Sequence, residues 1–274
     1  MRLFKFFILT SISCFAIPIA AQESETGVAN YAYSIFVGTG RYRINDRTIY
    51  VLRLPFTFQL REPDFPNDGL GLRFIAPVSV GITDFEDFNN LPTLDIDSLQ
   101  TVSFAPGIEL QVPVRENWLV KPFGQAGLGW DMKSSTNSFI WGAGARARGW
   151  FGKNDRLLVG GELLWAGNNP NNDEPDTSFT RLALGVEYKW QTNWEPFGRR
   201  VSWHTRLIHW MYGNAATLEP PIERVNIDNA TEIGVSFGIN PPINILGYKF
   251  RQGGIGIERS DEYSAVTLFT TFPF

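Results

Sequence analysis

The chain has 274 residues, of which 43% are hydrophobic and 14% aromatic, and its formal net charge is −4. This apolar content is too high and this net charge too small for a disordered chain, and a pI near 5.3 disfavours nucleic-acid binding through phosphate contacts. A mean hydropathy of −0.12 excludes a bundle of membrane helices, and the single cysteine, Cys14, excludes a disulfide framework and a multi-cysteine metal site.

Residues 1–21 have the layout of a secretory signal peptide. Basic residues precede an apolar stretch over residues 6–19, and Ala20-Ala21 precedes a polar run, which predicts cleavage after Ala21. A short periplasmic segment, residues 22–30, would then lead to the first strand. A retained anchor helix is disfavoured because the stretch is short for a membrane span. A lipid on Cys14 is disfavoured because apolar sequence continues after it.

From residue 31 onward, apolar residues recur at every second position. All even-numbered positions of residues 70–82 and of residues 102–114 are apolar, the pattern of strands with one apolar and one polar face. The segments are roughly 10–14 residues long, which suits tilted strands that cross a bilayer in about 9–11 residues. Twelve strands are expected, over residues 31–43, 47–60, 70–83, 99–114, 118–132, 138–151, 156–166, 178–190, 201–212, 230–239, 245–258 and 263–274.

The connections between these segments alternate in length, as they do in an outer-membrane barrel with short periplasmic turns and long outer loops. The short set covers residues 115–117, 152–155 and 240–242. The long polar set covers residues 83–98, 167–177 and 213–229.

Acidic residues crowd two of the long connections. Carboxylates suit Ca²⁺, but neither connection has a defined calcium-loop spacing, so we expect solvated surface loops, no metal site and no cofactor. The acidic residues are Asp84, Glu86, Asp87, Asp95, Asp97, Asp173, Glu174 and Asp176.

The last segment keeps its alternation to the final residues, Phe272-Pro273-Phe274. A secretory start, long alternating strands and a last strand that ends in Phe resemble the Gram-negative outer-membrane β-barrel proteins. The terminal strand is similar to the signal that their assembly machinery reads, which implies Phe272 and Phe274 as assembly-signal residues. Twelve strands with this ending also resemble the translocator barrel of autotransporters. Since residues 22–30 leave no room for a passenger, the solitary form is the better match.

The resemblance implies an all-β fold, a transmembrane antiparallel up-and-down barrel over residues 31–274, placed in the outer membrane after export. The implied partners are outer-membrane lipids, lipopolysaccharide and the assembly machinery, without nucleic acid, and the oligomeric state stays open. The alternative is a soluble all-β periplasmic barrel or sandwich, which does not explain the outward-facing apolar stripes.

The polar positions of the strands are expected to face the lumen, because Arg or Lys on the lipid side would cost about 2–4 kcal/mol each at the midplane. Cations outnumber acids there, although the whole chain is acidic. The cations are Arg53, Arg73, Lys121, Arg146, Arg148, Arg181, Lys189, Arg206, Lys249 and Arg251. The acids are Glu109, Asp131, Glu162, Glu187 and Glu232.

Two interpretations of these lumen charges stay open. Inward cations favour anions, so the barrel could be a narrow pore for small anionic solutes, with the greatest effect expected from Arg53, Arg73, Arg146 and Arg181 in mid-strand positions. Alternatively, Arg–Glu pairs fill a small lumen, and the barrel is a closed surface protein whose outer loops bind a partner or lipopolysaccharide.

The sequence predicts no enzymatic site. His204 and His209 are five residues apart on one strand, so only one faces the lumen, and we expect this to be His204. Ser202 shares its face and Glu232 lies on the next strand, a set that could form a Ser–His–acid arrangement. The chain lacks a phospholipase-like His-x-Ser-Asn-Gly signature and other common catalytic motifs. An outer-membrane lipid hydrolase is therefore only a remote alternative.

Overall fold

The computed structural model describes residues 36–44, 47–65, 69–83, 101–132, 136–171, 176–218, 225–245 and 248–274. The predicted signal peptide and residues 22–30 lie outside this part of the chain. No helix among the described residues is long and apolar enough to cross a membrane. The strands are β1 (Thr39–Ile44), β2 (Arg47–Arg61), β3 (Gly71–Thr83), β4 (Thr101–Phe104), β5 (Gly107–Arg115), β6 (Trp118–Asp131), β7 (Thr136–Phe151), β8 (Leu157–Pro170), β9 (Thr177–Gln191), β10 (Arg200–Leu218), β11 (Val225–Ile245), β12 (Tyr248–Arg259) and β13 (Tyr263–Phe269).

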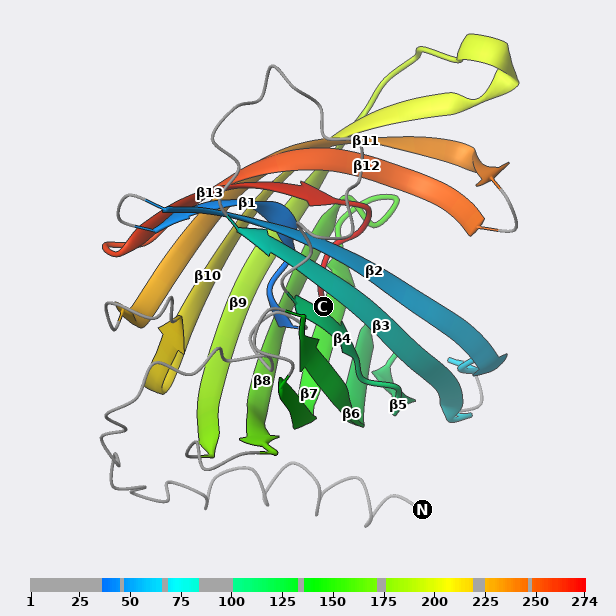
Figure 1. Cartoon of the computed structure of the whole chain (residues 1–274). Coiled ribbons are helices and arrows are strands. Elements are labelled where there is room, and N and C mark those ends of the chain that lie inside the picture. The colour runs from blue at the N-terminus through cyan, green and yellow to red at the C-terminus, as the bar shows by residue number, and fades with distance from the viewer. Residues whose placement is uncertain are drawn as a thin grey trace.

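These strands form one antiparallel sheet that closes into a barrel, because β1 pairs with both β2 and β13 (Figure 1). β4 and β5 both pair with β3 and β6, so they are two parts of one strand interrupted at Ala105-Pro106. The fold is therefore a closed barrel of 12 antiparallel strands, as the sequence predicts. We call the end where β1 begins and β13 ends the terminal end of the barrel.

Several strand boundaries differ from the prediction. Within the described residues β1 begins at Thr39 rather than near residue 31. The β10–β11 hairpin is longer than expected and takes in most of the predicted loop at 213–229. The predicted turn at 240–242 lies inside β11, because a register shift between Gly238 and Ile243 accommodates its two prolines within the strand.

The last strand also ends early. β13 ends at Phe269, although the apolar alternation continues to residue 274. Residues 270–274 leave the sheet, and Phe272 and Phe274 are buried.

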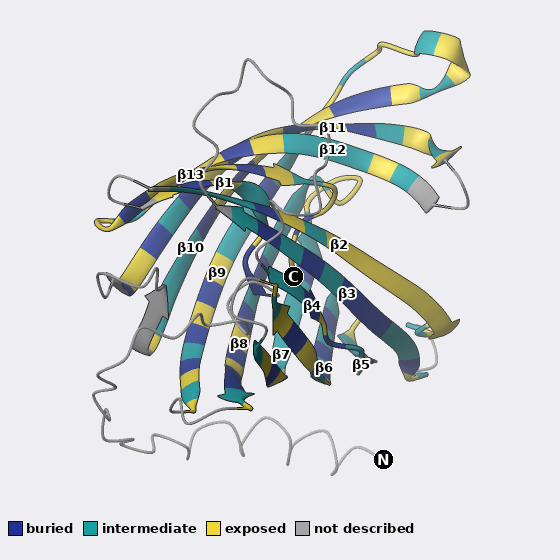
Figure 2. Cartoon of the chain, viewed as in Figure 1, coloured by how far each residue is buried: buried dark blue, intermediate teal, exposed yellow. Residues whose placement is uncertain are grey.

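The alternation sorts side chains between the two faces of the barrel, as predicted. Large apolar residues on the outer face stay exposed, such as Leu163, Ile233 and Ile257, each more than half exposed. Charged residues at neighbouring positions, such as Glu162 and Glu232, are buried inside. The burial of most strands therefore alternates along their length (Figure 2), and the outer surface carries a band of exposed apolar side chains of the kind that contacts other apolar material.

The seam between the first and last strands is closed along only part of its length. β13 ends opposite Gly254 of β12, and β1 reaches only as far as Val51 of β2. β12 continues to Tyr248 and β2 to Arg61, and the two long strands diverge toward the terminal end (Figure 1).

The face assignment predicts how single cysteines will react. In a Cys14→Ser background reconstituted in lipid vesicles, we expect a lipid-soluble maleimide to label Phe74→Cys and not Ser79→Cys, because Phe74 lies on the outer face and Ser79 is buried inside. Labelling of position 79 alone would contradict the register, since a one-residue slip exchanges the two faces.

Candidate functional site: the cationic lumen

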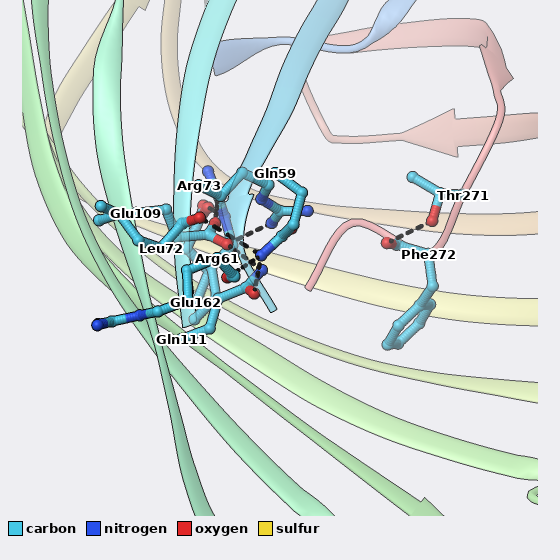
Figure 3. A network of polar contacts seen from close by, with 10 residues as sticks. Gln59, Arg61, Leu72, Arg73, Glu109, Gln111, Glu162, Thr271 and Phe272 are labelled. Carbon is cyan, nitrogen blue, oxygen red and sulfur yellow. Dashed lines mark hydrogen bonds and ion pairs between the residues drawn. The ribbon is translucent and has the colours of Figure 1, made fainter. Parts of the chain in front are cut away.

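A chain of ion pairs follows the inner wall of the barrel and joins side chains of β3, β5, β7, β8 and β9. Glu109 is fully buried and binds both Arg73 and Arg146, whose Nη1 lies 3.1 Å from Glu109 Oε2. Arg146 Nε also donates to Glu162 Oε2 at 2.7 Å, and Arg181 Nη2 donates to Glu162 Oε1 at 2.5 Å. Five predicted lumen residues therefore form one network, and Figure 3 labels Arg73, Glu109 and Glu162 of this network.

A second polar group lies near the seam. Arg206 pairs with Glu232, which also accepts a hydrogen bond of 2.7 Å from Thr267 Oγ1. The Arg206 guanidinium lies over the ring of Phe269. Nearby, the Tyr263 hydroxyl donates to Glu258, a buried acid that the sequence reasoning missed although it lies on the inward face of β12.

Three of the cations that line the central cavity have no carboxylate partner among the described residues: Arg53, Lys121 and Arg148. Lys121 is only 4% exposed. The Nε atoms of Arg53 and Arg148 are buried without a hydrogen-bond partner, and the Arg148 guanidinium lies over the ring of Trp150. An unpaired buried charge is costly, so the buried Lys121 and the half-buried Arg53 and Arg148 mark a candidate ligand site in the lumen.

The cavity that these cations line has a volume of about 1040 Å³. Seven of its ten charged lining residues are cationic, although the chain as a whole is acidic. The charged lining residues are Arg53, Arg73, Lys121, Arg146, Arg148, Arg181, Arg206, Glu162, Glu232 and Glu258.

The described residues before β1 also enter the lumen. Phe36 is buried and packs edge-on against Phe179 of β9, with 6.3 Å between ring centroids. Arg181 Nη1 donates to the Phe36 carbonyl at 3.0 Å. This segment therefore crosses the barrel from β1 to the opposite wall.

The C-terminal residues fill another part of the lumen. Phe272 and Phe274 pack edge-on, 5.1 Å apart, and form a buried cluster with Ala183 and Ile208. The Phe274 ring lies in a hollow over Gly160 and Gly185. These two positions need glycine, because a Cβ on either would lie only 2.7 Å from Phe274. The expectation that Phe272 and Phe274 lie on the last strand is therefore wrong, and their role as an assembly signal stays a prediction.

His204 faces the lumen as predicted, but its acid partner differs from the expected one. Ser202 Oγ lies 3.0 Å from His204 Nε2, and His204 Nδ1 lies 2.8 Å from Glu187 Oε1 on β9. Gln252 Nε2 donates to the other oxygen of Glu187 at 3.1 Å. The order is that of a hydrolase triad, but Ser202 is 8% exposed and neither Ser202 nor His204 lines the cavity. The contacts favour a structural hydrogen-bond chain.

The other predicted charges lie away from this network. Arg251 is exposed, and Lys189 and Asp131 are half-buried near strand ends. The side chain of Lys249 and the acidic residues at 84–97, 173 and 174 lie outside the described part of the chain. Among the residues that the structure describes, no group of three or more His, Cys, Asp or Glu could hold a metal ion.

No protein-family model and no curated protein matches the chain. Among solved structures, the chain is similar to the β domain of the Bordetella autotransporter BrkA, with a TM-score of 0.52 and 10% sequence identity. The match covers 85% of this chain and 96% of the BrkA chain. The fold is that of an autotransporter β domain. The predicted resemblance is confirmed at the level of the fold.

The Glu109 network predicts a large effect on stability. Glu109→Ala leaves Arg73 and Arg146 without this partner, and breaking a buried ion pair on one side costs about 3–5 kcal/mol. We expect the folded, fast-migrating gel band to be lost at a lower heating temperature in this variant. Glu116→Ala, in the exposed β5–β6 turn, is the control. Equal transition temperatures would contradict the network.

The Phe274 ring predicts two linked effects. Phe274→Ala removes the group that fills the hollow over Gly160 and Gly185, and Phe→Ala changes in packed cores cost roughly 3–5 kcal/mol. We expect a lower melting temperature of the folded band and a higher single-channel conductance. Phe197→Ala, in a fully exposed connection, should change neither. A drop in the amount of folded protein in the membrane, with conductance unchanged, would favour the assembly role instead.

Proposed function

We propose that this protein is a solitary, autotransporter-like outer-membrane barrel whose lumen binds and passes small anionic solutes, without enzymatic activity. The observation that carries the proposal is the set of three cavity-lining cations, Arg53, Lys121 and Arg148, that have no carboxylate partner among the described residues. Ionisable groups within a membrane-spanning barrel are costly, and they commonly mark the path of an ion or substrate.

The outer-membrane location is supported by the outer surface and by the fold. The apolar band of exposed Leu, Ile and Phe side chains suits hydrocarbon contact, and the fold matches an autotransporter β domain.

The ion pairs within the lumen limit which cations can select a solute. Arg73, Arg146 and Arg181 each hold a buried carboxylate, so they contribute more to structure than to attraction of anions. Arg53, Lys121 and Arg148 are free to attract a solute, and two of these, Lys121 and Arg148, were not among the four cations with the greatest expected effect.

The reversal potential of the reconstituted protein in a salt gradient tests the proposal. We expect anion preference in the natural chain and reduced preference in Lys121→Gln and Arg148→Gln, because each change removes one uncompensated positive charge from the lumen. Arg115→Gln, exposed at the end of β5, is the matched control.

Cation preference would contradict the proposal. A complete absence of conductance from correctly folded protein would also overturn it and would support the alternative of a closed barrel whose outer loops bind a partner or lipopolysaccharide.

A further inference from the structure

We propose that the open part of the seam between β2 and β12 is a lateral binding site for one phospholipid with an anionic headgroup. Its acyl chains would lie at the apolar rim, and its phosphate would lie on Arg53 and the lumen cations behind it. The inference rests on the proposed membrane location and on the proposed attraction of anions to the lumen, and it goes further by naming the ligand class and its route.

The opening follows from where the last residues of the chain go. β13 leaves the sheet after Phe269, opposite Gly254. Had residues 270–274 continued along β12 in the same register, they would have lain beside Lys249–Gly253. They turn into the lumen instead, where Phe272 and Phe274 are buried, and Figure 3 shows Thr271 and Phe272 of this segment. This half of β12 has no partner on that side among the described strands.

The facing edge of β2 carries residues suited to an edge. The Thr39 side chain ends the β1–β2 ladder, since its hydroxyl bonds both the N–H and the carbonyl of Arg53 at 2.9 Å. The next residue whose backbone points the same way is Pro55, which has no N–H to leave unpaired and is typical of edge strands. Beyond it, Thr57 presents its backbone to the opening. Unpaired backbone is unfavourable in hydrocarbon, so a polar group is favoured here.

Exposure shows that this half of β2 is open on both of its faces. Residues 54–61 are exposed at odd and even positions alike, whereas the other strands alternate (Figure 2). The outward Leu54 and Phe56 are 42% and 46% exposed. Both the inner and the outer face of this half of β2 are therefore accessible, which shows that the strand borders an opening.

The cavity passes through this opening, and its polarity changes along the way. Its lining includes the outward side chains Leu54 and Phe56 of β2 and Ile255 of β12, and also the lumen cations Arg53, Lys121 and Arg148. The inward Arg53 and the outward Leu52 and Leu54 all line the cavity, so the apolar rim and the cationic interior meet at this part of β2. An apolar rim in front of unpaired cations is complementary to an amphiphile with an anionic head. Neither a small inorganic anion nor a neutral lipid would use both parts.

Native mass spectrometry of delipidated protein tests this site. We expect one bound phosphatidylglycerol at low ligand concentration and at least about tenfold weaker binding of phosphatidylcholine with the same acyl chains. Arg53→Gln and Phe56→Ser should each weaken phosphatidylglycerol binding by a similar factor. Phe139→Ser is the matched control, because Phe139 is a similarly exposed outer-face phenylalanine on β7, away from the opening. Heat-modifiable migration confirms that each variant is folded.

Each other outcome would overturn the inference. Equal binding of the two lipids would mean an apolar groove that does not recognise the headgroup. Equal affinity for soluble glycerol phosphate would mean a lumen anion site without lateral access. If Phe139→Ser weakens binding as much as Phe56→Ser does, the lipid binds around the barrel and not at the seam. Anion-selective conductance without any preference for phosphatidylglycerol would leave the proposed function standing and remove this inference alone.

Discussion

The hydrogen bonds between β1 and β13 are the interaction on which the rest of the structure depends. A sheet surrounded by hydrocarbon has no water to satisfy its edges, so it must close on itself. Closure separates an outer face, which holds Leu and Phe side chains, from an inner face, which receives the charged residues. Both the apolar band and the ion-pair network follow from that one pairing. The incomplete seam follows from it as well, because neither of the two closing strands extends the full length of its neighbour.

The enclosed charges are arranged in two classes. Glu109 and Glu162 join arginines from three different strands into one network, which ties the wall of the barrel together from inside. Lys121 and Arg148 lie among these pairs without a carboxylate partner, and burying an unpaired charge lowers the stability of the fold. A purely structural network would be expected to balance its charges. The imbalance is therefore the feature that points to a ligand, and the enclosed space beside it gives that ligand room.

The sequence predicts the faces of the strands well because a period of two is a local property. Arg73, Glu109 and Glu162 could therefore be placed in the lumen without knowledge of their neighbours. Contacts between strands depend on register, which one sequence does not contain, and so Glu187 and not Glu232 binds His204. The C-terminal residues show a second limit. Thr270, Phe272 and Phe274 continue the alternation, but a hollow over Gly160 and Gly185 on distant strands takes the Phe274 ring out of the sheet.

The short closing strands also determine how the barrel will move. β1 and β13 share six residue pairs, and β1 and β2 share five, whereas β6 and β7 on the far wall share fourteen, so β1 is less protected than the far wall. Local opening takes place where the fewest hydrogen bonds must break, and we expect amide hydrogens of β1 to exchange before those of β7. Each such fluctuation would lengthen the gap already present beside β2. The width of the gap would then be a property of the ensemble, and it would change with temperature and, in the proposed membrane location, with the thickness of the bilayer.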